Sequence, residues 1–177
     1  MPALERWPCA ATTRIEHPMS QRTPQDVQAA LNALGLDTEV KIFNDSTATA
    51  AQAAEAIGTT LGSIVKSLCF LVDGKPILVL AAGDRLVDDR KLGAMHGVSR
   101  KKVRIADAEK TLEVTGFSPG GVSPVALIQP IPIYIDQSLS RFEVVYAAAG
   151  SPHAIFPIRL DDLARITGGA LCDVTRD

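Results

Sequence analysis

A single lysine stands inside an otherwise apolar or small-residue stretch, Ile64-Val65-Lys66-Ser67-Leu68-Cys69-Phe70-Leu71-Val72. These residue types predict a strand with apolar side chains on both faces, and such a strand is usually central in its sheet. Lysine is almost never fully buried without a partner, so Lys66 is a candidate for binding an anion or stabilising negative charge. The structural alternative places Lys66 near the start of the strand, with its ammonium group reaching solvent.

A second stretch, Gly116-Phe117-Ser118-Pro119-Gly120-Gly121-Val122-Ser123-Pro124, combines three glycines with two prolines. Glycine permits positive φ and leaves peptide N–H groups unobstructed, which suits a loop that cradles a phosphate or an oxyanion. A tight structural turn explains the same composition. The stretch lacks the Gly-Lys-Ser/Thr of a P-loop and the Gly-x-Gly-x-x-Gly of a dinucleotide site, so it predicts neither.

The remaining candidates for chemistry are weaker. His17, His96 and His153 have no metal-ligand spacing between them, and the sequence predicts no metal and no cofactor. Asp136 follows a strand-like run, where a carboxylate can orient a ligand or cap the next turn.

Length, composition and net charge limit the classes of protein to which this chain can belong. The chain has 177 residues, 46% of them hydrophobic and 21% charged, which predicts one soluble globular domain. The net charge of −2 excludes a protein that binds nucleic acid through its overall charge. A local exception is the stretch 85–104, in which seven basic and two acidic residues give +5. This stretch is either a polyanion contact or a solvated surface.

Cysteine usage and hydropathy predict the compartment. Cys9, Cys69 and Cys172 are widely spaced and odd in number, which favours a reducing environment over a disulfide framework or a zinc site. No apolar run reaches the roughly 18 residues of a membrane span, and Met1 to Ser20 lacks a signal peptide's hydrophobic stretch. We therefore expect a cytoplasmic protein.

The hydrophobic pattern predicts an α+β domain over 21–177. Residues 1–20 show no periodicity and are expected to form a disordered tail, with Met19 as the natural start. An Asp73-Gly74 turn between apolar runs predicts a β-hairpin. The expected helices cover 23–35, 47–57, 88–97, 107–116 and 160–167, and the expected strands cover 40–43, 64–72, 76–82, 131–135, 142–149 and 154–158. This mixed order favours a mixed or antiparallel sheet.

The motifs together resemble a known family. The strand around Lys66, the following strand that ends Ala81-Ala82-Gly83-Asp84-Arg85, and Thr115-Gly116-Phe117 leading into Gly120-Gly121-Val122-Ser123-Pro124 occur in this order. The pattern, from about Thr23 to Val174, resembles the YbaK/ProX family of trans-editing aminoacyl-tRNA deacylases, which are similar to the editing domain of bacterial prolyl-tRNA synthetases. The resemblance implies a mixed, curved, largely antiparallel sheet surrounded by helices. It also implies hydrolysis of the ester that joins a wrong amino acid to tRNA.

The resemblance assigns roles position by position. It implies that the catalytic positions are Lys66, Gly120, Gly121 and Val122. Substrate-binding positions would be Ser123, Pro124, Asp136, Gly150 and His153, although His153 falls where relatives vary. The segment 43–49 falls in a region that lines the amino-acid pocket in relatives. The tRNA-binding candidates of the basic stretch are Arg100, Lys101, Lys102 and Arg104.

The same resemblance implies the partners. They are the acceptor end of an aminoacyl-tRNA, with a small amino acid on tRNA-Pro or a related tRNA, and an aminoacyl-tRNA synthetase as a second candidate. A monomer and a homodimer both fit, and no membrane is expected. Two other classes remain open: a non-catalytic module of this fold that binds aminoacyl-tRNA or a synthetase, and an enzyme that forms a Schiff base through Lys66.

Overall fold

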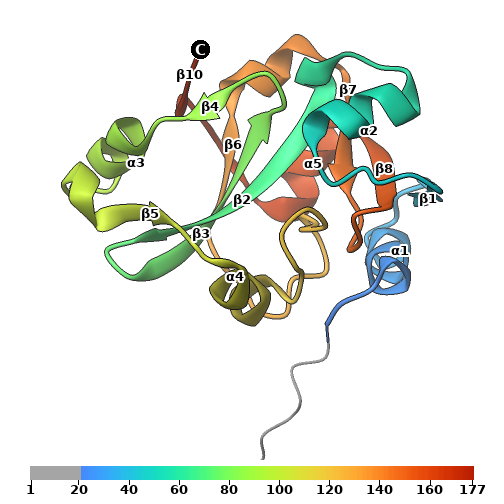
Figure 1. Cartoon of the computed structure of the whole chain (residues 1–177), viewed down its shortest axis with the longest axis horizontal. Coiled ribbons are helices and arrows are strands. Elements are labelled where there is room, and N and C mark those ends of the chain that lie inside the picture. The colour runs from blue at the N-terminus through green and yellow to red at the C-terminus, as the bar shows by residue number, and fades with distance from the viewer. Residues whose placement is uncertain (1–20) are drawn as a thin grey trace, which may run out of the picture.

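The chain is arranged around one curved, eight-stranded mixed sheet with helices on both sides (Figure 1). The computed structural model describes residues 21–177, so the expected tail over 1–20 and the expected start at Met19 lie outside the described residues. The strands run in the order β1 (Lys41–Ile42), β8 (Ala154–Arg159), β7 (Val144–Ala148), β2 (Ile64–Val72), β3 (Lys75–Ala82), β6 (Ile133–Asp136) and β9 (Ala170–Cys172), and β5 (Val103–Ile105) also pairs with β2. A separate ribbon joins β4 (Leu86–Val87) to β10 (Thr175–Arg176).

The strand pairings confirm the predicted fold class. Within the described residues, five pairings are antiparallel and three, β2 with β7, β3 with β6 and β6 with β9, are parallel. The hairpin of β2 and β3 turns through Asp73 and Gly74, whose φ angles are 49° and 80°. Two consecutive positive φ values are what a two-residue hairpin of this kind requires, so the Asp-Gly prediction is correct.

Five α-helices surround the sheet: α1 (Pro24–Ala33), α2 (Ala50–Ile57), α3 (Asp89–Met95), α4 (Ala108–Thr115) and α5 (Leu160–Thr167). Short 3-10 turns, η1 (Leu61–Ser63), η2 (Arg100–Lys102) and η3 (Gln137–Arg141), complete the described elements. Two of these helices begin at capped positions, since Thr23 and Asp26 make a capping box at α1 and Asp88 caps α3.

One helix boundary was predicted wrongly. The helix expected from residue 47 begins at Ala50, with Thr49 as its N-cap. Thr47 instead binds the carbonyl of Pro152, through its backbone N at 2.6 Å and its hydroxyl at 3.0 Å. Alanine-rich periodicity located this helix, but a distant part of the chain fixed its first turn.

Each face of the central sheet has its own core. On one face Leu31 of α1, Phe117, Phe156 and Leu163 of α5 form a fully buried cluster. On the other, Phe70 and Val79 pack with Leu92 of α3 and Val174. The strand that carries Lys66 is therefore central, as its composition predicts. Among residues 21–177, no helix is long and apolar enough to cross a membrane.

Candidate functional site

The strand that carries Lys66 has a gap along one of its edges. β3 pairs with β2 from Val65 to Val72. On the opposite edge, β7 pairs only with Ile64 and Val65, and β5 begins to pair at Phe70. Within residues 21–177, therefore, no strand lies beside the middle of β2 on that edge.

The peptide group of Ser67 faces this gap. The Cys69 carbonyl accepts a hydrogen bond from Ala106 N at 2.9 Å, and Asp73 N donates to the Lys102 carbonyl at 2.9 Å. These bonds show that odd-numbered residues of β2 direct their peptide groups toward β5, because alternate residues of a regular strand face opposite edges. Ser67 follows the same alternation, but neither ladder reaches it. Its side-chain hydroxyl is also buried, and it has no hydrogen-bond partner among the described residues.

A cavity of about 300 Å³ opens at the gap. Its polar lining comes from Lys66, Ser67, Thr49 and Tyr146. The rest of its wall is mostly small or aliphatic and is contributed by Thr47, Ala48, Ala50, Ala53, Ile64, Val65, Leu68, Gly120, Val122, Ala148 and Ile155. We call this the Lys66 cavity. The sequence pointed to Lys66, Gly120 and Val122, but it gave no signal for Ser67 or Tyr146.

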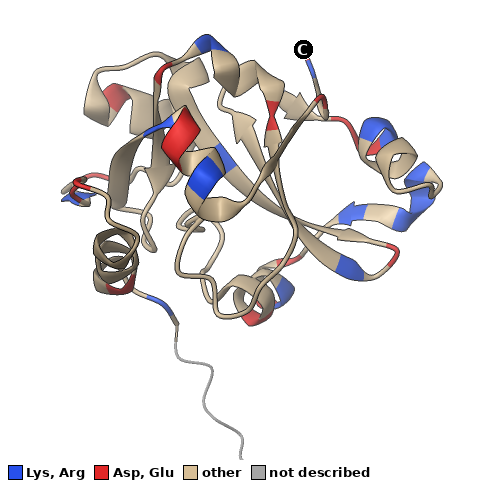
Figure 2. Cartoon of the chain, turned by 180° about the vertical axis from the view of Figure 1, so that it is seen from behind, with Lys and Arg blue, Asp and Glu red and all other residues tan. Residues whose placement is uncertain are grey.

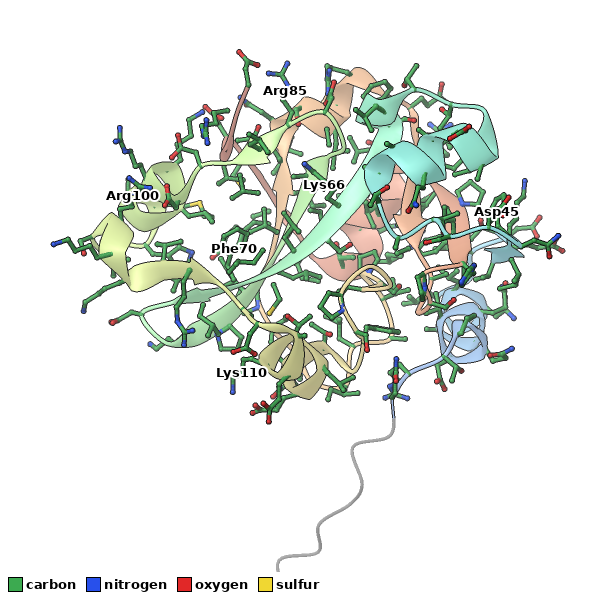
Figure 3. The ribbon with its side chains drawn as sticks, in the orientation of Figure 1. Asp45, Lys66, Phe70, Arg85, Arg100 and Lys110 are labelled. Carbon is green, nitrogen blue, oxygen red and sulfur yellow. The ribbon has the colours of Figure 1, made fainter. Side chains whose placement is uncertain are left out.

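Lys66 lies half-buried at the edge of the cavity, below Arg85 in Figure 3. Its ammonium group donates a hydrogen bond to the main-chain carbonyl of Arg85. Desolvation lowers the pKa of Lys66, and the nearby Asp84 carboxylate acts in the opposite direction. Asp84 is itself held by two hydrogen bonds from Arg141, of 2.6 and 2.9 Å. The ammonium is thus positioned by the fold rather than free in solvent.

The glycine loop forms the wall opposite β2. Gly120 has φ +87° and packs against Ala48, and a Cβ atom there would lie 3.1 Å from the Ala48 Cβ. At Gly121, a Cβ atom would lie 2.9–3.0 Å from three backbone atoms of Ser151. Gly121 also accepts a hydrogen bond from Gly150 N at 3.0 Å. The loop therefore needs glycine in order to lie this close to its neighbours.

The predicted positions Gly150 and His153 support the wall rather than line the cavity. Gly150 is buried with φ +85°, and a Cβ atom there would lie 3.0 Å from Phe117 and from the Thr23 backbone. His153 Nδ1 lies 3.1 Å from the Asp45 carbonyl oxygen, and its own carbonyl accepts from Phe43 N at 2.8 Å. These contacts hold the segment 43–49, of which Thr47, Ala48 and Thr49 reach the cavity.

Ser123 and Pro124 lie behind the loop. Ser123 is fully buried, and its hydroxyl accepts a hydrogen bond from Val125 N at 3.3 Å, as in a local turn. Pro124 lines a different surface hollow, beside Ala126 and Ile133. The structure therefore does not bring these two predicted substrate-binding residues to the Lys66 cavity.

Asp136 is also used within the fold. Its carboxylate is fully buried and accepts hydrogen bonds from Ser138 N (2.9 Å), Val174 N (3.0 Å) and the Thr175 hydroxyl (3.0 Å). Desolvation acts to raise the pKa of Asp136, but these hydrogen bonds outweigh it and lower the pKa below its usual value. The carboxylate caps η3 and links the C-terminal segment to β6. Of the two roles expected for Asp136, orienting a ligand and capping the next turn, the structure shows capping.

We expect Asp136→Asn to destabilise the protein by about 2 kcal/mol at neutral pH, because an amide cannot accept all three bonds. The folded-state pKa is depressed, so the stabilisation is present above the unfolded value and is lost as pH falls through the folded value. Urea unfolding between pH 7 and pH 3 measures this. The wild type should lose stability toward acid more steeply than the variant, and parallel curves would contradict the assignment.

The predicted tRNA-binding residues lie at the far end of β2 from the Lys66 cavity. Arg100 pairs with Asp89 at 2.7 Å and Lys102 with Asp73 at 3.0 Å; Asp89 is half-buried and the other three residues are exposed. Figure 2 shows the basic residues of α3, η2 and β5 gathered at one end of the molecule.

Within residues 21–177, no group of three or more His, Cys, Asp or Glu side chains could hold a metal ion.

A family model, a relative in sequence and a solved structure all bear on the family to which this chain belongs. Residues 44–166 match the model of the aminoacyl-tRNA editing domain. The chain is 36% identical over 143 residues to the uncharacterized protein YwhH of Bacillus subtilis, covering 80% of this chain and 89% of that protein. A crystal structure of a candidate trans-editing enzyme for prolyl-tRNA synthetase superposes with a TM-score of 0.81 at 35% identity, over 87% of this chain and 97% of that one.

A proline–tRNA ligase of Desulfovibrio desulfuricans is 38% identical over 111 residues, which are 62% of this chain but only 18% of the ligase. The likeness to the ligase thus covers a small part of that enzyme. These comparisons confirm the resemblance that the motifs around Lys66 and the glycine loop indicated. The chain belongs to the aminoacyl-tRNA editing domain family.

Proposed function

We propose that this protein hydrolyses the ester bond of a mischarged tRNA in trans. The observation that carries the proposal is the convergence of a positioned lysine, an unpaired strand edge and a glycine loop on one small cavity. Membership of the editing family and the candidate trans-editing enzyme of the same fold support the reaction class.

The chemistry needs no protein nucleophile. An aminoacyl ester is already activated, so a positioned water and stabilisation of the developing oxyanion suffice. Water adds to the ester carbonyl, the bond from that carbon to the ribose oxygen breaks, and a proton passes to the ribose oxygen. Peptide N–H groups near Gly120 and Val122 hold the carbonyl oxygen or the water. Lys66 supplies positive charge, either to the phosphate of the terminal nucleotide or to the reacting centre.

The unpaired peptide group of Ser67 adds a donor and an acceptor to this site. Its N–H and C=O face a gap that no strand of the described part of the chain fills, so they can bind a substrate in the manner of an added strand. The α-ammonium group of the bound amino acid is a suitable donor for the Ser67 carbonyl. This contact would orient the amino acid with its side chain toward the small residues of the wall.

The size of the cavity favours a small amino acid. A volume of about 300 Å³ is at the lower end for ligand sites, and it must hold the ester as well as the side chain. Ala48, Ala50, Ala53 and Ala148 make much of the wall. Larger amino acids would be rejected by steric exclusion, as in double-sieve editing. We propose a residue of the size of alanine, cysteine, serine or threonine, carried by tRNA-Pro or a related tRNA.

Ala148→Leu should shift this preference toward the smallest substrate. Ala148 is half-buried on β7 and lines the cavity, so a longer side chain there removes volume from the amino-acid pocket. We expect kcat/KM to fall by about 10–200-fold for a threonyl ester and much less for an alanyl ester. Ala33→Leu, at an exposed position of α1 and outside the cavity, is the control. Equal losses for both esters would contradict the pocket assignment.

Turnover by the purified wild-type protein on a panel of mischarged tRNAs tests the proposal and distinguishes its rivals. Release of a small amino acid, many times per protein molecule, supports the deacylase. Stable binding without release would instead show a non-catalytic module. Borohydride trapping with candidate aldehydes addresses the Schiff-base alternative. Burial lowers the pKa of Lys66, as such chemistry needs, but the nearby Asp84 carboxylate is already bound to Arg141 and is not available as a partner acid.

A further inference from the structure

A second cavity, of about 780 Å³, is lined by Arg85, the residue whose carbonyl accepts the hydrogen bond from Lys66. Four basic side chains line it, one each from the turn before β4, α3, η3 and β10: Arg85, Lys91, Arg141 and Arg176. Its other lining residues include Ser138, Asp136, Asp173 and Asp177. We call it the Arg85 cavity. Arg85 is the first residue of the basic stretch 85–104, whereas Arg141 and Arg176 lie outside that stretch.

One polar atom in this cavity wall lacks a hydrogen-bond partner within residues 21–177. Arg85 Nε is buried and bonds to no described atom. Buried polar groups are normally paired, and each exception calls for an explanation. An unpaired guanidinium N–H in a cavity lined by four basic side chains points to an acceptor that the protein does not itself provide.

The protein places one of its own carboxylates at this spot. Asp177 contacts the Nη1 atom of Arg85, although the Asp177 side chain is 93% exposed and the Arg85 side chain only 30%. Lys91 holds the preceding segment through Asp173 (2.6 Å) and the Thr175 carbonyl (2.7 Å). The Asp177 carboxylate contacts the guanidinium group at Nη1 and leaves the Nε–H without an acceptor among the described residues. An oxyanion with more oxygens, such as phosphate, can engage the whole fork.

The position of Arg85 connects the two cavities. Its carbonyl accepts the hydrogen bond from Lys66, while its side chain lines the second cavity (Figure 3). An RNA whose terminal ester is held at Lys66 must continue as a chain of phosphodiesters. We infer that the Arg85 cavity binds a phosphodiester of that RNA, and that the Asp177 carboxylate occupies the site until RNA displaces it. This inference rests on the proposed function for the identity of the RNA.

Binding of uncharged tRNA, followed by fluorescence anisotropy between about 50 and 200 mM salt, tests the inference without any hydrolysis. Arg85→Gln should weaken binding about 10-fold at the low-salt end and reduce the salt slope by about one. Asp177→Asn should strengthen binding, and this gain should vanish in the Arg85→Gln background, because the two side chains act on one site. Arg85→Lys, which keeps the charge without the fork, should fall between.

Matched charge changes provide the controls. Lys41→Gln and Asp37→Asn alter the same charges on exposed residues that have no ion pair within the described part of the chain. Equal effects of the control and cavity variants would overturn the site in favour of general electrostatics. If Arg85→Gln lowers the melting temperature too far, Arg176→Gln, an exposed cavity residue, carries the test.

A parallel titration with inorganic phosphate separates the two sources of this oxyanion. If Arg85→Gln abolishes phosphate binding but leaves RNA binding unchanged, the cavity holds a small phosphate ligand and the RNA assignment is overturned. If the predicted RNA pattern appears while the wild type releases no amino acid from any mischarged tRNA, only the proposed deacylase function fails. Unchanged binding of both ligands by Arg85→Gln overturns the inference while leaving that function intact.

Discussion

Lys66→Ala is expected to lower kcat/KM for deacylation of a mischarged tRNA by at least about 100-fold, the usual loss when one group that stabilises developing charge is removed. Lys66 is the cationic group that lines the cavity, and its ammonium is held there by the Arg85 carbonyl. A water molecule that fills the space of the deleted ammonium group carries no positive charge at that position. The barrier to ester hydrolysis therefore rises, because it depends on a charge held in the right place. Single-turnover release of the amino acid, with protein in excess, measures the effect on the chemical step.

The loss should not come from unfolding. Burial lowers the pKa of Lys66, so the folded state binds its proton less tightly than the unfolded state does. Stability therefore rises with pH between the folded and unfolded pKa values, and below them the buried charge costs stability. Lys66→Met should consequently melt at the wild-type temperature or above while being inactive. Lys75→Ala, at an exposed lysine on β3, is the matched control and should stay fully active. An active Lys66→Ala would contradict the role of Lys66.

Gly121→Ala is expected to have the second-largest effect. A methyl group at Gly121 would lie 2.9–3.0 Å from the N, Cα and C atoms of Ser151. Backbone atoms cannot rotate aside, so the loop must move, and overpacking of this kind costs about 1–3 kcal/mol. A displacement of about 1 Å at Gly120 and Val122, which line the cavity, can lower the rate about 100-fold. Urea unfolding and deacylation kinetics together measure both effects.

Gly35→Ala separates these effects from simple backbone strain. Gly35 has φ +74° at the end of α1, and a Cβ atom there would meet nothing within 4 Å. Its replacement should cost about 1 kcal/mol through the left-handed conformation alone and leave deacylation unchanged. If Gly121→Ala behaved like Gly35→Ala, with modest destabilisation and full activity, the loop would be a structural turn and not a wall of the site.

Local patterns predicted most of the elements. The start of α1 after Thr23, the Asp73-Gly74 hairpin and the strand from Ile64 to Val72 lie where periodicity and turn chemistry place them. The local pattern indicated none of β4, β5, β9 and β10, because these strands contain two or three residues each, too few to show a period. These strands form because they pair with segments that are distant in the sequence, so no local pattern predicts them.

The site was predictable only in part, for the same reason. Lys66 was identified because a charged residue inside an apolar strand is unusual in itself. Ser67 was not, because its significance comes from the end of β7 at Val65 and the start of β5 at Phe70, which lie on other parts of the chain. Asp136 and Ser123 were assigned to the substrate by resemblance, yet their side chains bond within the fold.

The most direct test of the account is a side-by-side time course of wild-type protein and Lys66→Ala on purified alanyl-tRNA-Pro and on correctly charged prolyl-tRNA-Pro. The account predicts rapid release of alanine by the wild type, loss of that release in the variant, and slow release of proline by both. A wild type that binds the alanyl ester but releases no alanine beyond the uncatalysed rate, across this and the other small amino acids, would contradict it.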